Sequence, residues 1–513
     1  MSEGAFDVII IGTGLTESIT AVAHLDTNPY YGGDEASLSL DEYVDWVTKQ
    51  NQNSFSSISA LNAYRQYSIT LCPSVIPATG PLISSLVASG VSRYGGFRLI
   101  EQIGVYSENK VKPVPASKED IFKDKSISLL EKRRLMRFLV FASGDFEGKP
   151  EMEGKEDIPF IEFLKTGPFA LNAEMAETIT YALSFCILPS GASTTSKHQT
   201  GPALHRLRRY LRSAGRYGPS PFLIGHYGSS GEIAQGFCRT AAVSGGVYIL
   251  GKPIASITRN ADSEDSTYTV KLEDFPEPIT CDLIISSASR LPAGVAEAEM
   301  NLLSASIARC ICIIDKPLSF APPKQSTSDQ VVEPAGEGEN ETPSPSAPAL
   351  DTGVLVFPPS SLPNGSDSAA GTMSVPKGKC TFTIPGVQDP ERLLKPYLDA
   401  TLSLSLSSSS SSAATPVDPL FTSFYIQSPS SSSSAPSPSA IPNMQELGRR
   451  SCGGCREVFW KGVEVLKSRK GRKASEEAVS GEGMKEGEFG VEINIESFWP
   501  SIGSDVDEDG DDD

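Results

Sequence analysis

The sequence has no apolar run close to the length of about 20 residues that a membrane-spanning helix needs. It also lacks an excess of positive charge, since 63 acidic residues against 44 basic ones give a formal net charge of −19. Nucleic-acid binders need clustered cations that displace counterions. The N-terminal residues are acidic, whereas a secretory signal begins with basic ones. These absences argue against a membrane-spanning, secreted or nucleic-acid-binding protein and predict a soluble, cytoplasmic one.

Histidine and paired cysteine motifs are also scarce. The four histidines have no metal-ligand spacing, and no nucleophile motif accompanies them. Nine cysteines, an odd number, form no disulfide framework, so most are expected to be small buried apolar residues. Cys452-Gly-Gly-Cys455 is an isolated C-x-x-C, for which a zinc or redox role is the weaker interpretation. The sequence therefore predicts no metal site.

A β-turn-α pattern opens the chain. The apolar run Phe6-Asp-Val-Ile-Ile-Ile11 ends at Gly12-Thr13-Gly14, after which a helix can start at Leu15. A dinucleotide fingerprint needs a third small residue, but Glu17 stands there, and its carboxylate would repel phosphates held by the loop. A purely structural turn is therefore favoured over a dinucleotide site, and no cofactor is expected.

The second strand of this unit comes unusually early. An acidic residue should follow the glycines by about 20 residues, yet Leu25-Asp26 comes almost at once. Residues 18–23 cannot supply both a full crossover helix and a strand, because a βαβ unit needs about 30 residues. Either the chain lacks part of the unit, which would compromise the first domain, or the gene sequence is imperfect.

Helical periodicity begins near residue 126. Apolar side chains between Ile127 and Leu139 share one side of a helix whose other side is basic, and further helical patterns span 172–185 and 204–214. These segments predict a helical domain, residues 126–214, inserted into the α/β body. Strand-like segments are expected at 246–250, 267–272, 282–286, 309–314, 381–384 and 421–426, and a closing helix at 458–466.

Low-complexity stretches rich in Ser, Pro, Glu and Gly interrupt the second half, and such compositions bury too little apolar area to offset the cost of ordering. Disordered insertions are therefore expected at 322–350, 403–414 and 428–440, followed by an acidic tail at 501–513. The remaining segments would form one discontinuous α/β domain of residues 1–125, 215–321, 351–402, 415–427 and 441–500.

Four motifs in order carry a family resemblance. They are Gly12-Thr-Gly-Leu-Thr-Glu-Ser18, Asp26-Thr-Asn-Pro-Tyr-Tyr-Gly-Gly33, Glu131-Lys-Arg-Arg-Leu-Met-Arg-Phe-Leu139, and the block from Arg216 through Tyr227-Gly-Ser-Ser-Gly-Glu232 and Arg239 to Tyr248. Together they resemble the family of Rab GDP dissociation inhibitors and Rab escort proteins. The resemblance implies a flavoprotein-like α/β fold without flavin. It also implies a platform that grips a GDP-bound Rab GTPase and a helical domain that houses the lipid of the GTPase.

The resemblance assigns five residues to the Rab-binding platform: Tyr31, Arg65, Glu232, Arg239 and Tyr248. The family usually has an acidic residue where this chain has Thr70. The spacing of Glu232 and Arg239 places both on one side of a helix, where they could contact a partner. The alternative to a binding role is that they pair with each other as a surface ion pair worth at most ~1 kcal/mol. Tyr31 and Tyr248 stand next to paired glycines and would provide rigid amphipathic anchors.

The resemblance also assigns a lipid pocket and a contact with Rab geranylgeranyl transferase. The expected pocket lining is Leu135, Phe138, Leu139, Met175 and Ile179, although apolar stripes are more often plain core. Tyr210 is the expected transferase contact, at a position where the family usually has phenylalanine.

Long Ser/Pro insertions, the acidic tail and Cys238, where inhibitors tend to have alanine, favour an escort protein. Such a protein would present GDP-bound Rab to the catalytic heterodimer of Rab geranylgeranyl transferase, help deliver the prenylated Rab in transient contact with membranes, and perform no chemistry itself. The alternatives are a GDP dissociation inhibitor that recycles prenylated Rab and, in another class, a flavin-dependent oxidoreductase.

Overall fold

A computed structural model describes the parts of the chain on which the following sections rest. They are residues 5–18, 23–49, 67–186, 199–227, 229–260, 267–286, 290–292, 307–315, 318, 320, 350–367, 370–376, 379–385, 389–404, 418–427 and 458–468. Arg65, Cys452, Cys455, the side chain of Glu17, nearly all of the three expected insertions and the acidic tail lie outside these residues. Ser403 and Leu404 end a helix, so the insertion expected at 403–414 was predicted to begin too early.

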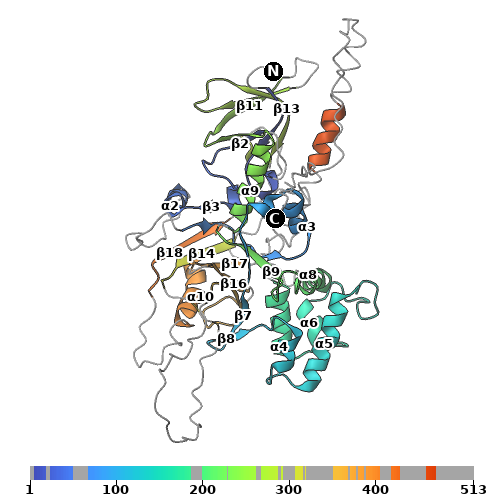
Figure 1. The fold of residues 1–513 in the computed structure, drawn as a ribbon. Helices are drawn as coiled ribbons and strands as arrows, with labels where there is room; N and C mark the ends of the chain where they lie inside the picture. Colours follow the sequence, from blue (N-terminus) through green and yellow to red (C-terminus); the bar gives the residue numbers. More distant parts are fainter. Residues whose placement is uncertain are drawn as a thin grey trace, which may run out of the picture.

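Within the described residues, a six-stranded sheet has the strand order β10-β2-β1-β13-β12-β11 (Figure 1). Its strands are β1 (Ala5–Ile11), β2 (Ala23–Asp26), β10 (Val247–Leu250), β11 (Ile254–Asn260), β12 (Thr267–Leu272) and β13 (Ile279–Ser286). The first four strands of that order are mutually parallel, whereas β12 and β11 continue the sheet antiparallel. The central strand β1 is an apolar β-branched run, as the interior of a parallel sheet requires.

The shortened first unit still forms its parallel strand pair. Helix α1 spans only Leu15–Ser18, and β2 begins at Ala23. Nevertheless Ile10 pairs with His24 and Ile11 with Leu25. The early position of Leu25-Asp26 is thus compatible with a paired β2 whose acidic residue ends the strand.

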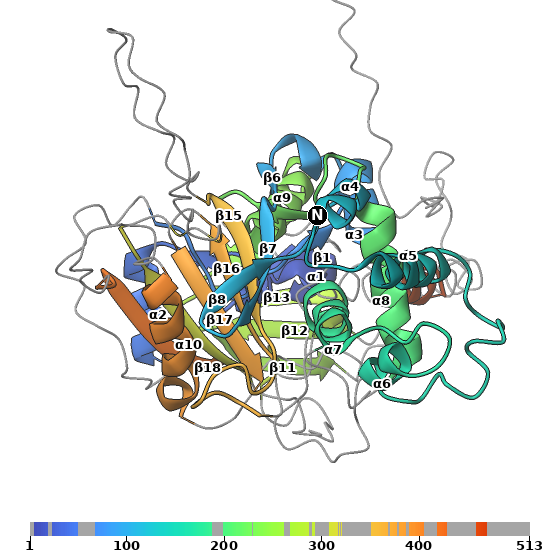
Figure 2. The ribbon, with the colours of Figure 1, turned by 90° about the horizontal axis from the view of Figure 1, so that it is seen from below.

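A seven-stranded sheet of order β18-β14-β17-β16-β15-β7-β8 forms the second body of the described chain. Its strands are β7 (Gln102–Ser107), β8 (Lys110–Pro113), β14 (Ile307–Ile313), β15 (Thr352–Phe357), β16 (Gly371–Pro376), β17 (Lys379–Pro385) and β18 (Phe421–Gln427). Helix α10 (Pro390–Leu404) covers the β14, β17 and β18 part of this sheet (Figure 2). Tyr397 of α10 is buried edge-on against Phe357, which shows how helix and sheet share one core.

Helices are grouped on the other side of the molecule (Figure 2). They are α4 (Lys118–Lys123), α5 (Leu129–Ser143), α6 (Phe160–Lys165), α7 (Ala173–Glu177), the π-helical turn η5 (Thr178–Leu183) and α8 (Thr200–Ser213). Ser128 and Glu131 form a capping box that starts α5. The core between these helices is rich in phenylalanine, including Phe138, Phe141 and Phe169.

The remaining elements connect these bodies. They are η1 (Gly33–Glu35), β3 (Ser37–Leu38), α2 (Leu40–Lys49), β4 (Ile69–Thr70), β5 (Ile76–Pro77), α3 (Pro81–Ala88), η4 (Val91–Arg93), β6 (Phe97–Leu99), β9 (Phe222–Gly225) and α9 (Ser229–Val243). Helix α9 lies between the two large sheets (Figure 1). The helix expected at 458–466 spans 458–468, and its Gly462 faces Leu283 and Ile285 of β13.

The cysteines and the lengths of the helices can be compared with what the composition predicts, for the described residues. All seven cysteines among them are buried and unbridged, which confirms the view of these residues as small apolar ones. No helix in the described ranges combines the length and apolar character that crossing a membrane requires.

Candidate functional site

The β1–α1 turn is bound tightly to the segment that carries Tyr31. Gly12 has φ +117°, which favours glycine. The Thr13 hydroxyl donates to Asp26 Oδ2 at 2.6 Å, and the Gly32 amide donates to the Thr13 carbonyl at 2.9 Å. The turn therefore positions residues 27–33, which follow β2.

A carboxylate faces the start of α1, but it is that of Glu35. The Leu15 amide donates to Glu35 Oε2 at 3.3 Å, and Gly14 directly before it is buried. A phosphate at this helix N-terminus would meet a negative charge instead of an available amide. Glu17, whose carboxylate was expected to repel phosphates at this loop, has its side chain outside the described residues, so that expectation stays a prediction, and Glu35 supplies a negative charge at the start of α1.

Tyr31 and Tyr248 lie together, and Tyr248 also contacts His24. The Tyr248 ring is stacked on His24 with centroids 4.7 Å apart, and Tyr31 meets Tyr248 edge-on at 5.6 Å. Burial raises the pKa of Tyr31, and it raises the pKa of Tyr248 by more. The nearby Cys238 thiol adds to both increases. Cys238, on α9, also contacts the Ser18 hydroxyl at 3.1 Å. These contacts join β2, β10, α1 and α9, and both phenols stay neutral at physiological pH.

Glu232, on the first turns of α9, holds a neighbouring loop. Its carboxylate accepts hydrogen bonds from the Gly96 amide at 2.9 Å and from the Tyr227 amide at 3.1 Å. Gly231 before it approaches Ala36 and Ser37 so closely that a side chain there would clash with their backbone. The absence of a side chain at Gly231 thus allows α9 to pack against the start of β3.

Arg239 occupies the same helix as Glu232, as its spacing predicted, and has a partner of its own. Its guanidinium lies over the Tyr94 ring, 4.7 Å from the centroid. Tyr94 is 54% exposed and Tyr227 65% exposed. Sequence reasoning missed both tyrosines, although Tyr94 precedes Gly95-Gly96 and so shows the same glycine-flanked pattern that drew attention to Tyr31.

The five residues expected to line a lipid pocket belong to the core of the helical region. Phe138 is fully buried between Phe160 and Phe169, with ring centroids at 6.5 and 5.2 Å. The others divide by burial, with Leu135 and Ile179 buried, and Leu139 and Met175 only partly so. In this structure the five positions are packed against protein, so a lipid would have to displace part of that packing.

Tyr210 does not present its ring to a partner. It is 6% exposed and lies edge-on to Phe222 at 5.5 Å, inside the core that joins α8 to β9. The periodicity of α8 places Tyr210 on the apolar stripe together with Leu207, and that stripe faces inward. A surface contact at Tyr210 therefore disagrees with its burial.

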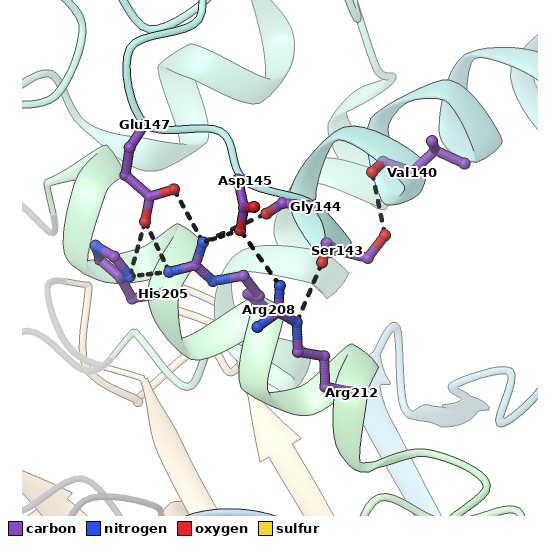
Figure 3. Close-up of polar contacts among 8 residues, drawn as sticks. All are labelled: Val140, Ser143, Gly144, Asp145, Glu147, His205, Arg208 and Arg212. Atoms are coloured by element: carbon purple, nitrogen blue, oxygen red, sulfur yellow. Dashed lines mark hydrogen bonds and ion pairs between the residues drawn. The ribbon is translucent and has the colours of Figure 1, made fainter.

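The loop after α5 is bound to α8 by a network of charged groups (Figure 3). Asp145 lies 3.6 Å from Arg208 and 3.5 Å from Arg212, and Glu147 lies 3.7 Å from His205. Arg212 Nε also donates to the Ser143 carbonyl at 3.3 Å. The network fixes the C-terminal end of α5 against the middle of α8.

The fold and the site define a class: a flavoprotein-like α/β protein with an added group of helices and a tyrosine-, glutamate- and arginine-bearing face around α9. The predicted fold class is confirmed by a solved structure, Rab GDI from Plasmodium falciparum, which is similar with a TM-score of 0.59 and 21% identity. That likeness covers 90% of this chain and 98% of the other.

A family model described as "GDP dissociation inhibitor" matches residues 1–339. The chain belongs to the GDP dissociation inhibitor family, as the four motifs predicted. It is 31% identical over 294 residues to the Rab proteins geranylgeranyltransferase component A of Drosophila melanogaster, covering 51% of this chain and 55% of that protein. The component A of Saccharomyces cerevisiae is 28% identical over 380 residues, with coverage of 70% and 56%. The chain thus spans about half the length of these curated relatives.

Proposed function

We propose that this protein is a Rab escort protein, which binds a GDP-bound Rab GTPase and presents it to Rab geranylgeranyl transferase for prenylation. The observation that carries the proposal is the similarity to two relatives named component A of the geranylgeranyltransferase for Rab proteins, within a family described as GDP dissociation inhibitors. The chemistry belongs to the catalytic heterodimer of the transferase, and this chain is a non-catalytic accessory subunit. It acts in the cytoplasm and contacts membranes transiently while it delivers the prenylated Rab.

The surface around α9 supports the Rab-binding part of the proposal. Tyr94 and Tyr227 are exposed there, and Arg239 holds its guanidinium over the Tyr94 ring. Tyrosine and arginine are the residue types most enriched among those that dominate the energy of protein interfaces. Because Glu232 uses its carboxylate to hold the Gly96 and Tyr227 amides, we assign it to ordering this surface as well as to contacting the GTPase.

The ring cluster of Tyr31 and Tyr248 supplies the second part of the proposed platform. Tyr31 is half-buried and is held edge-on by Tyr248, so it loses little conformational entropy when a partner binds. Arg65, outside the described residues, completes the proposed platform. The phenylalanine-rich helical region would accept the geranylgeranyl chain, because each methylene removed from water contributes about 0.8 kcal/mol.

The second candidate is a GDP dissociation inhibitor that recycles prenylated Rab. It is supported by the description of the family model and by the fold shared with Rab GDI of Plasmodium falciparum. The two candidates differ in the lipid state of the Rab that each must bind. An escort protein binds the unprenylated form, whereas a recycling inhibitor needs the lipid for most of its affinity.

The deciding experiment measures binding and prenylation side by side. The purified chain is titrated with unprenylated Rab loaded with GDP or with a non-hydrolysable GTP analogue, and geranylgeranyl transfer by the catalytic heterodimer is then followed with and without the chain. Preference for the GDP form together with stimulated transfer supports the escort function. Binding of prenylated Rab alone supports the recycling inhibitor. Failure to bind any Rab, combined with stoichiometric flavin in the purified protein, supports the oxidoreductase.

A further inference from the structure

The fold class of this protein normally holds a dinucleotide at the carboxyl ends of its parallel strands, where the pyrophosphate meets the glycine turn and an acidic residue binds the ribose. In this chain that edge is formed by the ends of β1, β2 and β13. Ile11 at the end of β1 pairs with Ser286 at the end of β13. Arg290, which follows Ser286 by four positions in the sequence, lies beside the β1–α1 turn.

The Arg290 side chain fills the space over the glycine turn. A methyl group added at Gly12 would lie 3.1 Å from Arg290 Cδ, and one added at Gly33 would lie 2.5 Å from Arg290 Nη2. The guanidinium therefore rests against the backbone that a pyrophosphate would approach. The Arg290 side chain is only 17% exposed, so it is an internal group and not a surface arginine.

The carboxylate of Asp26, the acidic residue at the end of β2, is also satisfied by other groups of this chain. Asp26 is 1% exposed, and Arg290 Nη1 lies 4.0 Å from its Oδ2. Oδ2 also accepts the Thr13 hydroxyl at 2.6 Å, and Oδ1 accepts the Asn28 amide at 2.9 Å. A carboxylate so buried needs these donors and a positive charge nearby. No ribose hydroxyl is needed to satisfy it.

The residues present thus do not fit a dinucleotide: Arg290 covers the glycines, Asp26 is satisfied internally, and Glu35 faces the first turn of α1. We propose that Arg290 fills the space over the glycine turn in which a dinucleotide would bind, here called the cradle. Through its contacts with Asp26 and Gly33, Arg290 also positions the segment 27–33, which carries Tyr31. Arg290 is a positioning residue, since it acts on the platform through other groups. The link to Rab affinity rests on the proposed function, whereas filling of the cradle does not.

A second observation places Arg290 beside this segment. Burial raises the pKa of Tyr30 to about 12, the Asp26 carboxylate adds to the increase, and the Arg290 charge opposes it. Arg290 therefore acts electrostatically on the residue next to Tyr31.

The test uses the full-length chain and two variants, Arg290→Ala, which empties the cradle, and Arg290→Met, which keeps much of its volume without the charge. Amide hydrogen exchange reports on the turn without any Rab. We expect Arg290→Ala to speed exchange at least tenfold in residues 12–14 and 26–33 and to leave α5 unchanged, with Arg290→Met intermediate. Unchanged exchange in both variants, or acceleration spread evenly over the chain, overturns the proposal.

The cradle itself is probed with FAD and with ADP-ribose in titration calorimetry. The wild type is expected to bind neither, and a variant that combines Arg290→Ala with Glu35→Gln, which removes both the filling side chain and the negative charge at the first turn of α1, is expected to bind at least one of them measurably. Equal affinity of wild type and variant for both probes overturns the filling role. Loss of Rab binding in Arg290→Ala, with exchange altered only around Tyr31, supports the positioning role. If Arg290→Ala speeds amide exchange locally but neither the wild type nor the variants bind Rab, the proposed function is contradicted. The assignment of Arg290 to the cradle is still supported in that case.

Discussion

Arg208 and Glu147 face each other through two hydrogen bonds: Arg208 Nη2 donates to Glu147 Oε1 at 2.7 Å and Nη1 donates to Oε2 at 2.9 Å (Figure 3). The same guanidinium lies over the Phe146 ring at 4.6 Å. Hydrogen bonding from Arg208, more than any other cause, lowers the pKa of Glu147 to about 2. The pair thus joins the loop after α5 to α8 with a geometry that fixes both side chains.

Glu147→Gln is expected to lower the free energy of unfolding at pH 7 by about 1 kcal/mol, the upper range for an exposed pair with two-pronged geometry. The folded-state pKa lies below the ordinary 4.5, so this stabilisation is fully present above about pH 4.5 and is lost as pH falls toward 2. Urea unfolding of wild type and variant between pH 7 and pH 3 measures the difference. The matched control is Glu153→Gln, an exposed glutamate of the same loop. A difference that stays constant down to pH 3 contradicts this assignment.

Gly231→Ala is expected to destabilise the protein by about 1–3 kcal/mol, because the new methyl group meets the backbone of Ala36 and Ser37. Since Glu232 follows directly, Rab affinity should fall as well. Gly201→Ala is the control, because Gly201 also lies near the start of a helix. A methyl group added there would lie 3.8 Å from the Glu156 carbonyl oxygen, an ordinary contact distance. That control should be neutral or stabilising by up to about 1 kcal/mol. Equal effects of the two substitutions in urea unfolding would refute the close approach.

Local patterns predicted local structure well. The turn Gly12-Thr13-Gly14, the helical spacing in α5 and α8, and the common helix of Glu232 and Arg239 are all present. What the sequence could not supply is contact between distant segments. Arg290 over Gly12 and Tyr94 under Arg239 have no local signature, because they arise from the order of parallel strands and from the packing of α9.

Burial was also hard to predict at single positions. Tyr210 and Arg239 both stand on amphipathic helices, yet one ring points into the core and the other side chain lies on the surface. Helical periodicity separates the two faces of each helix and places Tyr210 on the apolar stripe of α8, but the resemblance that assigned Tyr210 to a surface contact carries no information on burial. The inward position of Tyr210 depends on Phe222, which reaches it from β9.

Arg239→Ala is expected to weaken binding of GDP-loaded Rab by at least tenfold while leaving the melting temperature nearly unchanged. Its contact with Tyr94 is at the surface, so stability loses little, whereas an interface loses an arginine anchor. Arg216→Ala is the matched control, because that exposed arginine also lies over a tyrosine ring, Tyr217, at 5.5 Å. Fluorescence anisotropy with labelled Rab gives both affinities. Arg239 has no platform role if the two variants bind alike.

Phe138→Ala and Leu139→Ala test whether the residues expected to line the lipid pocket serve only the core of the helical region or also bind lipid. Phe138 is fully buried, so its truncation should cost about 3–5 kcal/mol of stability. Leu139 is partly exposed and should cost only about 1 kcal/mol. If the helical region houses the lipid, Leu139→Ala lowers affinity for a geranylgeranylated Rab peptide severalfold but not for the unlipidated peptide, as titration calorimetry would record. A folded Leu139→Ala variant that binds the lipidated peptide as tightly as the wild type does contradicts a lipid-binding role for Leu139, which is only partly buried beside the core of the helical region.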